Sequence, residues 1–150
     1  MGHFPQMAET VKIRAAVMQA LLAEARRNSW QECCGFLAGR DGVITATLSA
    51  ANLLASPSAY EIGPVELFRL VREMRAQNLE HLGIYHSHPA GENAPSPRDI
   101  ERAFYPDVAY LIVSPRPDAT QPVRGFSIRG GKVNEFAIAV VQPGSGETKT

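Results

Sequence analysis

Residues 108–114 (VAYLIVS) restrict the fold more than any other segment, because an unbroken run of apolar, β-prone residues is typical of a buried strand. Helical and strand-like patterns alternate around it. Helices are predicted at residues 11–28 and 64–78, and a short third helix opens at Ser96-Pro97. Strands are predicted at residues 33–38, 43–50, 82–88, 108–114, 123–129 and 132–141. This order predicts an α/β fold, in which two main helices and a short one flank a mixed β-sheet.

Both main predicted helices have an apolar side. The side of the first helix consists of Ile13, Val17, Ala20 and Leu21, which recur with a period of 3.6 residues. Glu24 falls on the same face, so we expect the contact with the core to weaken towards the end of this helix. Pro64 suits the first turn of the second helix. The expected apolar side of that helix consists of Val65, Leu67, Phe68, Val71 and Met74.

Length and composition exclude several classes of protein. The 150 residues fit one domain, expected at residues 11–141, with an N-terminal tail at 1–10 and a disordered C-terminal tail at 142–150. Fifteen basic and fifteen acidic residues cancel, which argues against non-specific binding of nucleic acid. No apolar run reaches the roughly 18 residues of a membrane span. The N-terminus lacks the pattern of a secretory signal, so a cytoplasmic protein is expected.

The two cysteines, Cys33 and Cys34, are adjacent in a predicted strand. A disulfide between neighbours joins no distant parts of the chain, which also favours a reducing, cytoplasmic setting. Adjacent side chains of a strand point to opposite faces, so the pair is poorly placed to bind one metal ion. We interpret both cysteines as small buried hydrophobic residues.

The segment around His86-Ser87-His88-Pro89 carries the clearest chemical pattern. Two histidines at i and i+2 of a strand point to one face and can share a metal ion. Pro89 ends the strand, and Asp99 lies one turn into the following helix. Two histidines and one carboxylate leave the fourth position of a zinc ion open for water. The alternative for Asp99 is a structural role as the capping partner of Ser96.

Two further residues suit hydrolysis at such a site. Glu32 directly precedes an apolar strand and is the candidate general base, the alternative being a surface acid at a helix–strand junction. Ser96 is placed to donate a hydrogen bond to the oxyanion of a tetrahedral intermediate. It also fits the N-cap of the short helix, and the two roles are compatible.

The segment His86-Ser87-His88-Pro89, six residues, Ser96, two residues and Asp99, with Glu32 upstream, resembles the motif of the JAMM (MPN+) metalloproteases. The stretch at residues 32–39 (ECCGFLAG) is similar to the first strand of that family, and the likeness extends over residues 11–141. The resemblance implies a JAMM, cytidine-deaminase-like fold. It implies His86, His88 and Asp99 as zinc ligands, Glu32 as general base and Ser96 as the stabiliser of the intermediate.

The resemblance also implies a substrate. Members of the family cleave peptide or isopeptide bonds after the C-terminal glycine of ubiquitin-like proteins, and compact bacterial members act on sulfur carriers of that fold. Only ten residues separate Asp99 from Tyr110, which leaves little room for the inserts that hold ubiquitin chains. We therefore expect a small ubiquitin-like partner. Tyr60 and Glu61 are candidates to line the groove for its tail, whereas Glu92 is either a substrate contact or a solvated loop acid.

Two other functions stay open at this point. RadC-type proteins, linked to DNA repair, have a similar His-x-His-Pro and Ser-x-x-Asp pattern, but they typically have Asn where this chain has Ser87 and lack the strand that follows Glu32. A non-catalytic MPN scaffold is the other alternative, and the presence of all five motif residues disfavours it.

Overall fold

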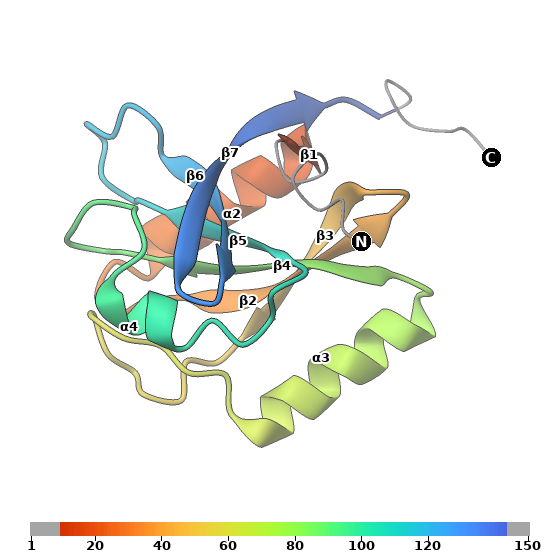
Figure 1. Cartoon of the computed structure of the whole chain (residues 1–150), viewed down its shortest axis with the longest axis horizontal. Helices are drawn as coiled ribbons and strands as arrows, with labels where there is room; N and C mark the ends of the chain where they lie inside the picture. Colours follow the sequence, from red (N-terminus) through yellow and green to blue (C-terminus); the bar gives the residue numbers. More distant parts are fainter. Residues whose placement is uncertain (1–9, 144–150) are drawn as a thin grey trace.

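The computed structural model describes residues 10–143, and within them seven strands form one sheet that closes into a barrel (Figure 1). The elements in chain order are β1 (Thr10–Arg14), α2 (Ala15–Arg27), β2 (Cys34–Arg40), β3 (Val43–Ala50), α3 (Pro64–Ala76), β4 (Glu80–Ser87), α4 (Pro97–Glu101), β5 (Ala109–Val113), β6 (Val123–Arg129) and β7 (Lys132–Val141). The expected tails fall outside the described residues, apart from Thr10, which begins β1, and residues 142–143.

The sheet is mixed, as predicted, and its strands follow the order β1-β3-β2-β4-β5-β6-β7. Antiparallel pairs join β2 to β3 and to β4, whereas β4 and β5 run parallel on either side of the connection that contains α4. A two-residue turn with positive φ at Gly130 and Gly131 joins β6 to β7, as hairpins of this length require. The metal-ligand candidates therefore lie where the central strand β4 leaves the sheet.

Strand β1 corrects the predicted helix over residues 11–28, which begins only at Ala15. Val11 and Ile13 are buried and alternate with the exposed Lys12, which is a strand period rather than a helical one. β1 pairs in parallel with β7 and with β3, and it closes the barrel. Because these partners are distant in the sequence, tertiary pairing outweighs the local pattern here.

The two main helices pack on opposite faces of the sheet (Figure 1). α2 covers one face through Val17, Leu21 and Ala25, which pack with residues such as Leu37 and Leu111. The other core cluster includes Leu70 and Met74 of α3 with Phe36, Ile112 and Phe126 of the sheet. Side chains that alternate along β2 and β5 thus enter different cores, as expected for strands covered on both sides.

In each main helix the buried side differs from the apolar side that the sequence predicted. The core contact of α2 does not weaken at Glu24, because Ala25 is fully buried and the Tyr85 hydroxyl donates a 2.6 Å hydrogen bond to Glu24 Oε1. Ala20 is exposed. In α3, Leu70 and Met74 form the buried stripe, and Val65 and Phe68 lie off it with 82% and 65% of their surface exposed.

Cys33 and Cys34 are free and buried, in agreement with the interpretation as small hydrophobic residues. Burial raises the pKa of Cys33 to about 11 and that of Cys34 to about 12, so both thiols stay protonated.

Between residues 10 and 143 there is no helix of sufficient length and hydrophobicity to cross a membrane.

Candidate metal centre

Three side chains from β4, the residue after it and α4 meet at one point. The Nε2 atoms of His86 and His88 lie 3.1 Å apart, and Asp99 Oδ2 lies 3.2 Å from the first and 3.0 Å from the second. Tetrahedral zinc with bonds of about 2.0–2.1 Å holds its ligand atoms about 3.3 Å apart. The three atoms are therefore spaced as three ligands of one such ion, and a fourth position is left open.

The electrostatics of these groups suit a cation. Burial raises the pKa of Asp99, but hydrogen bonds from His86 and His88 outweigh burial and hold the pKa well below its usual range. Burial lowers the pKa of His86. For His88, burial lowers the pKa, but the hydrogen bonds with Asp99 and with the Glu92 carbonyl outweigh it and raise the net value. The carboxylate is thus ionised at neutral pH and compensates for positive charge at the cluster.

Glu32 adds a second carboxyl group beside the histidines. One of its carboxylate oxygens lies within 4.8 Å of the ring nitrogens of His86 and His88. Its side chain is buried, and Oε1 has no hydrogen-bond partner among the described residues. Burial raises the pKa of Glu32 to about 7. A buried, unpaired carboxyl that titrates near neutrality is suited to accept and return a proton.

Pairing between β2 and β4 brings Glu32 to this place. Cys34 lies opposite His86 in the register of the two strands. Ser87, between the two histidines, then ties β4 to Cys33, because its backbone N–H donates to the Cys33 carbonyl at 3.0 Å and its Oγ accepts from the Cys33 N–H at 2.9 Å. Glu32 is the next residue along, so the position of its backbone follows from the sheet.

Ser96 has the capping geometry and also remains available to a substrate. Its Oγ accepts a hydrogen bond from the Asp99 N–H at 3.1 Å, and Asp99 Oδ2 accepts one from the Ser96 N–H at 2.9 Å. This reciprocal pair is a capping box, and it holds the same Asp99 oxygen, Oδ2, that faces the two histidines. The hydroxyl hydrogen of Ser96 is not used in either bond and can be donated elsewhere.

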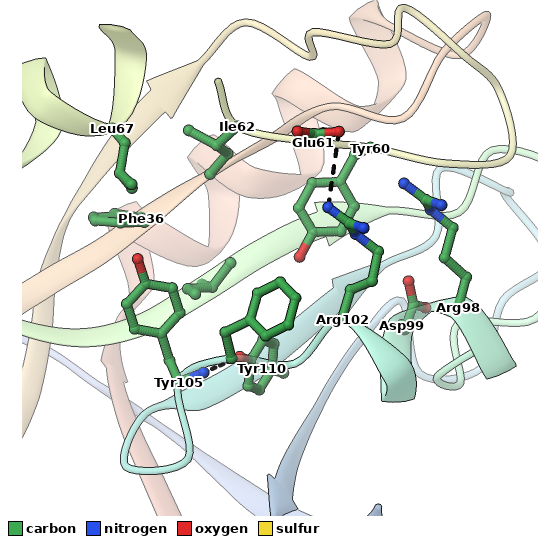
Figure 2. A pocket seen from close by; sticks show the side chains of 12 residues that line it. Phe36, Tyr60, Glu61, Ile62, Leu67, Arg98, Asp99, Arg102, Tyr105 and Tyr110 are labelled. Carbon is green, nitrogen blue, oxygen red and sulfur yellow. Dashed lines mark hydrogen bonds and ion pairs between the residues drawn. The ribbon is translucent and has the colours of Figure 1, made fainter. Parts of the chain in front are cut away.

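Tyr60 and Glu61 border a groove that runs from Asp99 towards α3 (Figure 2). The ring of Tyr60 stacks on His86, with centroids 4.4 Å apart and planes 24° apart. Burial raises the pKa of the Tyr60 hydroxyl, which therefore stays neutral. Arg98 of α4 and Arg102, the residue that follows this helix, reach over the groove, and Arg102 Nη2 lies 3.8 Å from Glu61 Oε1. The apolar lining consists mainly of Phe36, Ile62, Leu67, Phe104, Tyr105 and Tyr110.

Glu92 takes a different place from Tyr60 and Glu61. Its side chain is exposed and lies outside this groove. Its backbone carbonyl oxygen lies 2.7 Å from His88 Nδ1 and is the atom of Glu92 that contacts the cluster.

Asn52 and Asn93 are two buried residues near the site that the motif did not single out. Asn52 donates to the carbonyls of Glu32 and Ala59, both at 3.0 Å. The sequence shows only that each is an asparagine in a predicted loop, and their burial and hydrogen bonds come from the structure.

The comparison with known families decides the classification. The family described as prokaryotic homologs of the JAB domain matches residues 14–128, which is most of the chain. The chain belongs to this JAB-domain family. The expectation of a JAMM-type fold in one small domain is thereby confirmed.

Similar proteins agree with this membership. The JAB-domain chain is 35% identical over 132 residues to the CysO-cysteine peptidase of Mycobacterium tuberculosis, a match that covers 87% of this chain and 90% of that protein. It is 34% identical over 137 residues to the desampylase of Haloferax volcanii, with 87% and 96% covered. The solution structure of a Desulfitobacterium hafniense protein is 33% identical and superposes with a TM-score of 0.79, covering 87% and 92%. The JAB-domain chain is thus an enzyme of the JAMM peptidase type.

Proposed function

We propose that this JAB-domain protein is a zinc-dependent metallopeptidase that hydrolyses the bond after the C-terminal glycine of a small ubiquitin-like sulfur carrier. The observation that carries the proposal is the triangle of His86 Nε2, His88 Nε2 and Asp99 Oδ2, with sides of 3.0–3.2 Å. Beside it lies the buried Oε1 of Glu32, which has no hydrogen-bond partner within residues 10–143. The first three atoms are spaced to bind one metal ion, whereas the Glu32 carboxylate is suited to act as the general base.

The residues fit zinc better than a hard cation. Two imidazole nitrogens and one carboxylate form a donor set typical of catalytic zinc, whereas calcium and magnesium take oxygen ligands. His86, His88 and Asp99 would hold the ion. Zinc, when bound, would supply a Lewis acid that polarises the scissile carbonyl and makes water acidic near neutral pH.

Glu32 and Ser96 would move the proton and stabilise the charge. The Glu32 carboxylate takes a proton from the attacking water while a bond forms between the water oxygen and the glycine carbonyl carbon. The Ser96 hydroxyl donates to the oxygen that becomes negative. When the C–N bond breaks, Glu32 returns the proton to the leaving amine. The raised pKa of Glu32 suits both transfers, because the group can be ionised before and protonated after the attack.

The groove supports a thin, flexible tail as the substrate segment. It starts at Asp99 and is bordered by Tyr60, Glu61, Arg98 and Arg102 (Figure 2). A glycine-terminated tail has no bulk next to the scissile bond and could enter beside the stacked rings of Tyr60 and His86. The names of the two relatives, a CysO-cysteine peptidase and a desampylase, favour conjugates of small modifier proteins over ubiquitin chains.

The test is to incubate the zinc-loaded protein with a ubiquitin-like carrier that bears a short extension after its terminal glycine, and to record intact masses. We expect loss of the extension as one hydrolysed fragment, and no loss when a chelator has removed the metal. A carrier with Gly→Val at the residue before the scissile bond is the matched control and should be cleaved far more slowly. Cleavage at another peptide bond, or full activity in chelator, contradicts the proposal.

A further inference from the structure

Asn93 lies in the loop between β4 and α4, and its side chain is anchored by both amide hydrogens. The residue is 93% buried, and its Nδ2 donates to the Ile112 carbonyl at 3.3 Å and to the Gln121 carbonyl at 2.8 Å. Ile112 belongs to β5, and Gln121 to the connection between β5 and β6. A loop residue that uses both hydrogens of its amide on two separate segments is fixed in position, because either bond alone would still allow rotation.

The anchored residue is joined to the carbonyl that faces His88. The C=O of Glu92 and the N–H of Asn93 belong to one planar peptide unit, so fixing Asn93 restricts the direction of that carbonyl. The Glu92 carbonyl oxygen lies 2.7 Å from His88 Nδ1. A carbonyl can only accept, so His88 donates from Nδ1 in this bond. Nε2 faces the Asp99 carboxylate, and when Nε2 gives its lone pair to a metal ion the ring proton lies on Nδ1.

Strand β5 also holds the backbone of His88. The His88 backbone N–H donates to the Val113 carbonyl at 2.9 Å, one residue after the carbonyl that accepts from Asn93. Two consecutive carbonyls of β5 therefore hold the metal loop between β4 and α4: that of Val113 binds the His88 backbone, and that of Ile112 binds the Asn93 side chain. His86 has no such arrangement, since its Nδ1 has no hydrogen-bond partner among residues 10–143 and its ring is held by stacking on Tyr60.

We infer that Asn93 is a positioning residue, which selects the Nδ1–H tautomer of His88 through the Glu92 carbonyl and so presents Nε2 as a metal ligand. The inference rests on the proposed function, because it takes His88 as a zinc ligand. Groups that orient the ligands of a metal typically affect its affinity by about 10- to 100-fold. Asn93 does not touch the cluster, so its effect must pass through His88.

The experiment compares Asn93→Ala with wild type by two measurements. Zinc affinity is measured by competition with a chelator, and the ring nitrogen signals of His88 are recorded by NMR in metal-free protein above pH 8. Met74→Ala is the control, because it removes a buried side chain from the α3 core without touching the metal loop. We expect zinc affinity about tenfold or more weaker in Asn93→Ala only. We also expect the share of the Nδ1–H form of His88 to fall in that variant, because Nε2 keeps Asp99 as an acceptor while Nδ1 loses a fixed one.

Two results would overturn the inference. One is a zinc affinity of Asn93→Ala within threefold of wild type; the other is an equal loss in Met74→Ala, which would make the effect one of general stability. The NMR measurement separates this inference from the proposed function because it needs no zinc and no substrate. A wild-type protein that cleaves no carrier, but whose His88 tautomer and zinc affinity depend on Asn93, contradicts the proposed substrate and supports the role of Asn93.

Discussion

The ring of Tyr60 stacks on the ring of His86 at a centroid distance of 4.4 Å. Tyr60 belongs to the loop between β3 and α3, whereas His86 lies in β4, so the contact ties the groove to the metal centre. Stacked rings contribute about 0.5–1.5 kcal/mol beyond the area that they bury. The contact therefore stabilises the orientation of His86, a proposed zinc ligand whose own Nδ1 has no partner among the described residues.

Replacing Tyr60 tests this contact. In Tyr60→Ala the ring of His86 loses its stacking partner, and we expect zinc affinity to fall about three- to tenfold, which corresponds to the stacking energy. Tyr60→Phe keeps the ring and should bind zinc within about twofold of wild type. Both are measured by competition with a chelator. Equal losses in the two variants would show that the hydroxyl, and not the ring, supports the site.

Glu32 should make the metal-free protein less stable as the pH rises. Its pKa is 4.5 in the unfolded chain and about 7 in the folded one, so between these values the folded state binds more protons. Stability is thus fully present below pH 4.5 and is lost as the pH rises through 7. Relative to wild type, Glu32→Gln should gain about 3 kcal/mol between pH 4 and pH 8 in urea unfolding. A difference between the two proteins that does not change with pH contradicts the raised pKa.

Zinc affinity should depend on pH through His88. Hydrogen bonds with Asp99 and the Glu92 carbonyl raise the pKa of His88, so its ring takes up a second proton more readily than a free imidazole, and zinc must displace that proton. Affinity should therefore fall by about tenfold per pH unit on the acid side of that pKa. Asp99 contributes little to this change, since its pKa lies well below its usual range. The same affinity at pH 8 and pH 6 would exclude His88 as a ligand.

Phe104 should affect substrate binding without affecting stability. It lines the groove and is 67% exposed, so Phe104→Ala should change the free energy of unfolding by less than about 0.5 kcal/mol. Loss of its contact with the tail should raise KM about fivefold and leave kcat unchanged, as for uniform binding. Phe68→Ala is the matched control, because Phe68 is 65% exposed but lies outside the groove. A similar KM in both variants places the substrate elsewhere.

The sequence predicted the cluster because its spacing is local. His86 and His88 share a face of β4, and Asp99 follows within one loop and one helical turn, so a short segment brings the three together. Glu32 was proposed from its place directly before an apolar strand and from the resemblance, whereas the pairing of β2 with β4 that brings it to the histidines is known only from the structure. The alternation in β1 covers only five residues and runs directly into α2, so the sequence pattern predicts it as part of the helix; the strand is fixed by partners that include β7, at the far end of the described chain. Asn93 depends on two carbonyls 19 and 28 residues away, and no local pattern indicates them.

The central claim is that Glu32 is the base of a zinc-dependent hydrolysis. Its most direct test is the cleavage rate of Glu32→Gln on a carrier with a C-terminal extension, measured on protein shown to contain one zinc per chain. We predict that the variant binds zinc as wild type does and cleaves at least about 100-fold more slowly, the loss expected for a general base. A zinc-loaded Glu32→Gln protein that cleaves as fast as wild type would contradict the account.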